Sequence, residues 1–135
     1  MTGAVLRGGC LCGDVRYEIA GPLGAIEHCH CTMCRKAHGA AFSTNTAVPA
    51  ASLRITLGAA LISEYASSPN RRKSFCSRCG SQLFIHRTNA PETMVVTLGT
   101  LDDPGQARPL RHVFVASKAA WLDIADGLPQ HAIYP

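Results

Sequence analysis

Apolar and polar residues alternate in short runs along most of the chain. Val15, Tyr17 and Ile19 alternate with two charged residues, which is the pattern of a half-buried β-strand. The glycine-rich turn before this run predicts a hairpin over residues 4–19. Further strands are expected around residues 29–31 and over residues 40–48, 53–57, 61–65, 74–84, 93–98 and 110–115. The pattern therefore predicts a mainly β chain of about eight or nine short strands.

Two segments have a composition that permits helix. Residues 32–38 can form about two turns, with Thr32 as the N-cap and Gly39 after the last turn. Residues 117–127 are expected to form a second short helix, whose Trp121 packs into the core. We therefore expect one or two short helices beside the strands.

The seven cysteines fall into three groups along this pattern. These groups are Cys10 and Cys12, then Cys29, Cys31 and Cys34, then Cys76 and Cys79. Thiolates spaced C-x-C or C-x-x-C bind one soft metal ion, because the intervening turn brings both sulfurs to the same point. Seven is one fewer than two four-sulfur sites require. One site can therefore close with four sulfurs, whereas the other needs a ligand from elsewhere.

More than one partition of the cysteines fits this count. The outer pairs supply four thiolates for a closed structural site, and the central group supplies three with an open fourth position. In one alternative, Cys31 and Cys34 join Cys76 and Cys79 in a zinc ribbon. In another, His38, which lies one helical turn after Cys34, closes the central site. Spacing alone favours the open three-sulfur site.

The strand pattern and the charge of the central cysteines both indicate what this group can bind. On a strand, Cys29 and Cys31 share one face while His28 and His30 share the other, so His30 is poorly placed to bind the same metal. Three thiolates on Zn²⁺ also give a weaker Lewis acid than three neutral histidines would. The central group therefore favours capture of a substrate thiol over peptide or ester hydrolysis.

The composition indicates one globular domain, residues 1–135, with 47% hydrophobic residues. No apolar run approaches the roughly 20 residues of a membrane span, and the start of the chain does not resemble a signal peptide. We expect a cytoplasmic protein without a membrane partner. In that compartment thiols stay reduced, and clustered cysteines are more often metal ligands than disulfides.

The formal net charge of +4 is a weak signal for nucleic acid. Seven thiolates and two zinc ions would contribute −7 and +4, which leaves +1. Aromatic residues make up 6% and charged residues 16%, so an interleaved basic and aromatic surface is not expected. The basic run of residues 71–73 is interpreted as a solvated face. The alternative to an enzyme is a non-enzymatic, zinc-stapled binding module with a macromolecular partner on its basic surface.

At the cysteines, the sequence resembles the glutathione-dependent formaldehyde-activating enzyme family, which also contains centromere protein V. The matching pieces are residues 9–13, 28–36 and 75–81, together with the ending from His112 through Trp121 to Pro129. The resemblance implies a β-tent fold of small, coiled, antiparallel sheets stapled by zinc. It implies two Zn²⁺ per chain, with a structural ion on Cys10, Cys12, Cys76 and Cys79 and a catalytic ion on Cys29, Cys31 and Cys34.

The resemblance also implies an activity. The family's named reaction condenses glutathione with formaldehyde to S-(hydroxymethyl)glutathione and is classed as a carbon–sulfur lyase reaction. A family member acting on a different thiol and aldehyde is the nearest alternative. Because glutathione carries two carboxylates, the candidate substrate-binding residues are basic, namely Arg35, Lys36, Arg71, Arg72, Arg87 and His38. Candidate proton shuttles are His28, His30, His38, His86 and His112.

Overall fold

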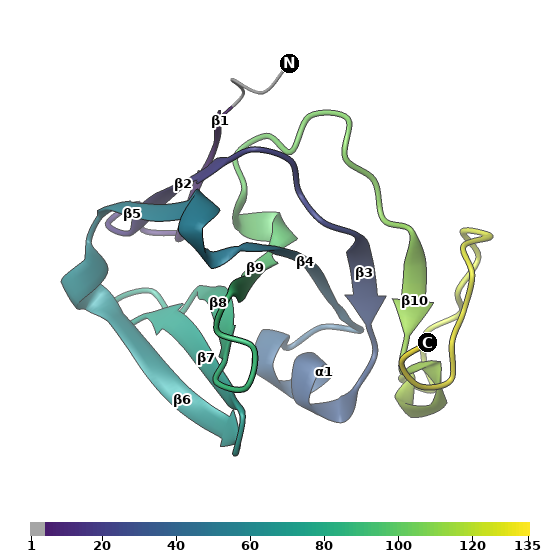
Figure 1. The fold of residues 1–135 in the computed structure, drawn as a ribbon. Coiled ribbons are helices and arrows are strands. Elements are labelled where there is room, and N and C mark those ends of the chain that lie inside the picture. Colours follow the sequence, from purple (N-terminus) through teal and green to yellow (C-terminus); the bar gives the residue numbers. More distant parts are fainter. Residues whose placement is uncertain (1–4) are drawn as a thin grey trace.

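Ten strands form two sheets in the computed structural model of the protein, which describes residues 5–135 (Figure 1). The strands are β1 (Val5–Gly9), β2 (Arg16–Ala20), β3 (Ile26–Cys29), β4 (Ser43–Pro49), β5 (Leu53–Leu57), β6 (Ile62–Ser68), β7 (Arg71–Cys76), β8 (Gln82–Arg87), β9 (Thr93–Thr97) and β10 (Arg111–Val113). The helices are α1 (Thr32–His38) and four 3₁₀ turns, η1 (Ala50–Ser52), η2 (Ala59–Leu61), η3 (Leu98–Thr100) and η4 (Val115–Ser117). β1 and β2 confirm the expected hairpin from Val5 onward. Residue 4, where the hairpin was predicted to begin, lies outside the described residues.

The two sheets have simple, mostly antiparallel orders. The small sheet runs β1-β2-β5, and the large sheet runs β10-β3-β4-β9-β8-β7-β6. Among the strand pairs formed by residues 5–135, only β10–β3 is parallel. The large sheet curls, so that α1 lies between its β3 side and its β6–β7 side (Figure 1). This arrangement confirms a mainly β fold of small coiled sheets.

The core lies between the small sheet and one face of the large sheet. Tyr17 and Ile19 of β2 are buried with Val48, Phe84 and Val96 of the large sheet. The Tyr17 and Phe84 rings meet edge to face with centroids 5.1 Å apart, a favoured aromatic geometry. This face of the large sheet is therefore occupied, and α1 must pack on the other.

The strand register shows which residues share that second face. Directly paired residues point to the same side of a sheet, and the side alternates along each strand. Cys29 pairs with Ser43, and the pairings then run through β4, β9 and β8 to Lys73 of β7. The sulfur of Cys29 and the side chain of Lys73 thus project from one face, the face covered by α1.

The segment after β10 departs from the expectation of a second helix. Beyond η4 it is a strap rather than an α-helix, and Trp121 is 72% exposed instead of lying in the core. Lys118 supplies a reason, because its ammonium donates to Ala119 O at 3.1 Å and to Leu122 O at 2.5 Å. In an α-helix these carbonyls would accept from amides four residues later. The end of the strap then pairs with β10, where the His131 amide donates to His112 O at 2.9 Å. None of the helices between residues 5 and 135 is long and apolar enough to cross a bilayer.

Candidate metal centres

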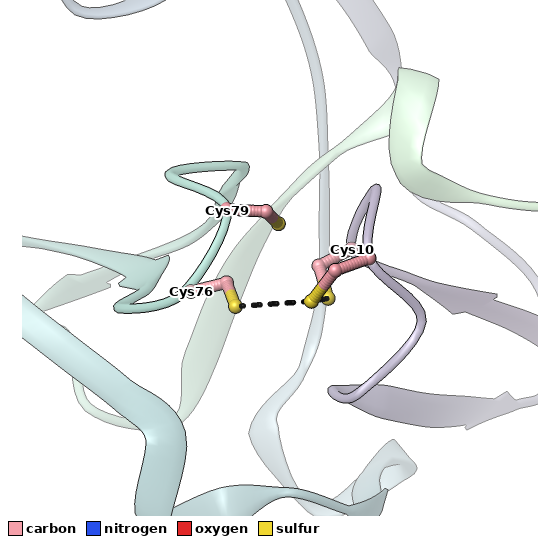
Figure 2. A group of neighbouring side chains, drawn as sticks. Cys10, Cys76 and Cys79 are labelled. Atoms are coloured by element: carbon pink, nitrogen blue, oxygen red, sulfur yellow. Dashed lines mark hydrogen bonds between the residues drawn. The ribbon is translucent and has the colours of Figure 1, made fainter.

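The first candidate centre joins two turns that lie far apart in the sequence. Cys10 and Cys12 lie in the turn between β1 and β2, and Cys76 and Cys79 lie at the turn between β7 and β8. Figure 2 shows Cys10 facing Cys76 and Cys79. Their four sulfurs lie within 4.8 Å of one another, with Cys10 and Cys12 3.5 Å apart and Cys12 and Cys76 3.9 Å apart. A tetrahedral zinc with Zn–S bonds near 2.3 Å places its sulfurs about 3.8 Å apart. The four side chains therefore fit a zinc ion.

Ser81 ties the two turns together beside these sulfurs. Its Oγ accepts a hydrogen bond from the Leu11 amide at 2.9 Å and lies 3.3 Å from the Cys79 sulfur. Hydrogen bonding from Ser81 lowers the pKa of Cys79 to about 5, which favours the thiolate that a metal requires. Sequence reasoning did not assign this role to Ser81, whose only signal is its position two residues after a ligand-type cysteine.

The second candidate centre forms at the start of α1. Cys29 ends β3, while Cys31 is the N-cap of α1 and accepts a hydrogen bond on its sulfur from the Cys34 amide at 3.2 Å. The expectation of a Thr32 cap was wrong, because this sulfur takes the capping role one residue earlier. The expected end at Gly39 is confirmed, with φ 58° in the left-handed region that glycine tolerates.

The cap geometry draws three sulfurs together and leaves His38 outside the group. The sulfurs of Cys29, Cys31 and Cys34 lie within 4.8 Å of one another. Among residues 5–135, His38 does not join them at ligand distance, and Cys76 and Cys79 group with Cys10 and Cys12 instead. The zinc-ribbon alternative and the His38-closed alternative therefore do not describe this fold.

Crowding shifts the pKa values of the three central thiols in different directions. Contact with the Cys29 sulfur lowers the pKa of Cys31, and contact with the Cys31 sulfur raises the pKa of Cys29. Without a cation, one thiolate thus forms at the expense of its neighbours. A metal ion can replace those protons. Cys29 and Cys31 are only half-buried, so the centre stays accessible.

A third group, made of histidines, is hydrogen-bonded rather than arranged around a metal. His112 Nε2 donates to Asp126 Oδ2 at 2.8 Å, and its Nδ1 therefore accepts from His30 Nε2, also at 2.8 Å. The Nε2 and Oδ2 atoms are closer than the about 3.3 Å that two ligands of a tetrahedral zinc would show. His28 stacks beside His112, with ring centroids 4.8 Å apart. This bonding turns the His30 ring toward His112, in agreement with the expectation that His30 does not ligate beside Cys29 and Cys31.

The candidate substrate-binding cations do not gather into one patch. Lys36 and Arg72 are exposed, while Arg87 donates to Thr93 Oγ1 at 2.6 Å. Arg35 follows Cys34 on α1 and is half-buried. Arg71 and Arg87 pair across β7 and β8, on the face of the sheet that carries Cys29. Arg72 pairs with His86 on the opposite face.

The interpretation of residues 71–73 as a solvated run was wrong at one position. Lys73 is only 8% exposed, and α1 lies on the inner side of the curled sheet, beside β7 (Figure 1). Alternation along β7 sends Arg72 to the other side. The run is therefore not a continuous basic surface.

A large surface hollow lies away from both sulfur groups. It measures about 700 Å³ and is lined mainly by apolar residues, including Leu23, Ile26 and Leu110. It holds neither cysteines nor histidines, so the chemistry of the sulfur groups, and not concavity, identifies the candidate site.

Comparisons with known proteins agree with the cysteine pattern. A family model described as "Glutathione-dependent formaldehyde-activating enzyme" matches residues 5–117. A Halomonas elongata protein named "Putative glutathione-dependent formaldehyde-activating enzyme" is 32% identical over 129 residues, which cover 89% of this chain and 81% of that protein. The crystal structure of a Rhodobacter sphaeroides protein matches with a TM-score of 0.62 and 25% identity, over 74% of this chain and 91% of that one. The resemblance seen in the sequence is confirmed.

The buried histidine pair generates a prediction about pH. Burial lowers the pKa of His30 to about 4, well below the usual 6.5, so His30 should stay neutral at pH 5.5. A depressed histidine pKa stabilises the fold above pH 6.5, and this contribution is lost as the pH falls toward 4. In NMR spectra recorded from pH 7.5 to 5, the chemical shifts of the His30 imidazole should not change, whereas those of free histidine should titrate. A His30 titration centred near pH 6.5 would contradict the prediction.

Proposed function

We propose that the chain, which belongs to the glutathione-dependent formaldehyde-activating enzyme family, joins a small thiol to an aldehyde as a carbon–sulfur lyase-type enzyme. One observation carries the proposal: the seven cysteines divide into four sulfurs around one point and three around another. Four cysteine sulfurs are a typical ligand set of a structural zinc, whereas three protein ligands leave the fourth coordination position to a substrate. The best single thiol is glutathione, and the best aldehyde is formaldehyde.

The two sulfur groups are assigned different roles in this proposal. Cys10, Cys12, Cys76 and Cys79 hold a structural zinc that fastens the small sheet to the large one. Cys29, Cys31 and Cys34 hold the catalytic zinc, so the chain carries two Zn²⁺. When bound there, zinc would lower the pKa of a substrate thiol and present its sulfur as a soft nucleophile.

The protein's own residues fix the geometry of that reaction. The N-cap of α1 orients Cys31 and Cys34, and the end of β3 brings Cys29 to the same point. A new bond forms between the thiol sulfur and the aldehyde carbon while the carbonyl π bond breaks, and the thiol proton ends on the new hydroxyl oxygen. Arg35 and Arg87 remain candidates for binding substrate carboxylates. A thiol needs reduced surroundings, which agrees with the cytoplasmic location that we propose.

The division of roles predicts unequal effects of two substitutions. Cys76→Ala should abolish cooperative folding, because Cys76 is fully buried and a structural zinc supplies folding free energy on the order of 10 kcal/mol. Cys34→Ala should keep the fold and lose one of two zinc ions. Metal analysis and thermal unfolding followed by circular dichroism measure both effects. Equal loss of structure in the two variants would show that the central centre is structural as well.

The open position predicts a requirement for a free thiol. Glutathione, cysteine and 2-mercaptoethanol should each raise the melting temperature and bind in calorimetry, whereas their S-methyl analogues should not, since a thioether cannot supply a thiolate. The thiol effect should vanish in Cys34→Ala.

The activity itself can be measured with the same panel. With ¹³C-labelled formaldehyde, the protein should accelerate appearance of the S-hydroxymethyl signal above the uncatalysed rate for at least one thiol. Equal binding of a thiol and its S-methyl analogue would reject sulfur ligation at the open position, and an unchanged rate for every thiol would reject the enzymatic proposal.

A further inference from the structure

A buried lysine lies near the central sulfurs without any carboxylate beside it. Lys73 is 8% exposed, and within residues 5–135 it forms neither an ion pair nor a side-chain hydrogen bond. Glu27 shares its sheet face, but Arg111 occupies that carboxylate at 2.6 Å. With most of its side chain covered and no carboxylate beside its charge, Lys73 is free to interact with an anion of another kind.

The curl of the large sheet indicates that this anion is the group of central thiolates. In a flat sheet, β3 and β7 would lie about 19 Å apart, which is four strand spacings. Because the sheet bends around α1, β7 instead faces the helix that begins at Cys31 (Figure 1). Lys73 and Cys29 project from the same face of this sheet. The side chain of Lys73 therefore lies on the α1 side of the sheet, as the sulfur of Cys29 does.

The electrostatics of neighbouring groups agree with this placement. After the contacts with Cys29 and Cys34, the positive charge of Lys73 also lowers the pKa of Cys31. Burial lowers the pKa of His38, and the charge of Lys73 lowers it further. The charge of Lys73 thus reaches both ends of α1, and neutral His38 adds no competing charge.

We propose that Lys73 is the positioning residue that balances the negative charge of the Cys29–Cys31–Cys34 metal centre and selects an anionic sulfur as its fourth ligand. Three thiolates and one divalent ion carry a net charge of −1, and a substrate thiolate makes it −2. A neutral fourth ligand adds no charge and gains nothing from the lysine. The selection of a thiolate rests on the function proposed above, whereas the balance of the three-sulfur centre does not.

The test uses the cobalt-substituted protein, whose absorption bands report ligands at the metal. Lys73→Met removes the charge with little change of shape, and Lys73→Arg keeps it. Arg108→Met is the control, because Arg108 is an exposed cation between β9 and β10 that has no role in the proposed site. The probes are 2-mercaptoethanol, which binds as an anion through sulfur alone, and imidazole, which binds as a neutral ligand.

Lys73→Met should weaken 2-mercaptoethanol binding about tenfold or more and change imidazole binding by less than about threefold. Lys73→Arg should restore most of the affinity, and Arg108→Met should match the unsubstituted protein. Equal changes for both probes, or no change, would overturn the proposal. If 3-mercaptopropionate weakens while 2-mercaptoethanol does not, Lys73 binds a substrate carboxylate instead, and the proposal is again overturned.

A second readout separates this inference from the enzymatic one. The Co²⁺ affinity of the central centre alone should fall in Lys73→Met and recover in Lys73→Arg, with the spectrum of the four-sulfur centre unchanged as evidence of folding. If no thiol binds to the unsubstituted protein but this affinity pattern holds, the proposed function fails and charge balance by Lys73 stands. An unchanged Co²⁺ affinity in Lys73→Met would reject the role of Lys73.

Discussion

The meeting of four sulfurs from two distant turns is the contact on which the rest of the structure depends. Cys10 and Cys12 come from the small sheet, and Cys76 and Cys79 come from the large one. Ser81 fixes the approach through the Leu11 amide, and the apolar core fills the space between the sheets. A metal ion here would join elements about 65 residues apart, which closes a long loop at one point. With the two sheets held in this way, the opposite face of the large sheet is left for α1.

That opposite face carries both the three central thiols and Lys73, whose charges can balance each other when a metal ion is bound. Three crowded thiols need a cation, and Lys73 carries a positive charge with no carboxylate beside it. The curl of the sheet around α1 brings both into one space, where a metal–thiolate centre would satisfy each of them. In this account the charge of the site, and not a deep cavity, accounts for a preference for soft, anionic ligands.

The sequence was sufficient for much of this picture and insufficient for definite parts of it. Alternation and cysteine spacing are local signals, so the β class, the β1–β2 hairpin and the extent of α1 could be predicted. Pairing between distant segments is not local, and the burial of Lys73 depends on three intervening strands. The exposed Trp121 was not predicted either, because the Lys118 ammonium binds the Ala119 and Leu122 carbonyls that a helix over residues 117–127 would use. The N-cap at Cys31 was missed because sulfur is a rare cap and Thr32 a common one.

The central claim is that one centre is complete with four protein sulfurs while the other accepts a fourth sulfur from a small thiol. ¹¹³Cd NMR of the cadmium-substituted protein tests this claim directly, because the chemical shift depends strongly on the number of sulfur ligands. The account predicts two resonances, one in the four-sulfur range throughout and one that moves into that range when glutathione is added. Two resonances whose chemical shifts do not change when thiols are added, or a single resonance for one shared site, would contradict it.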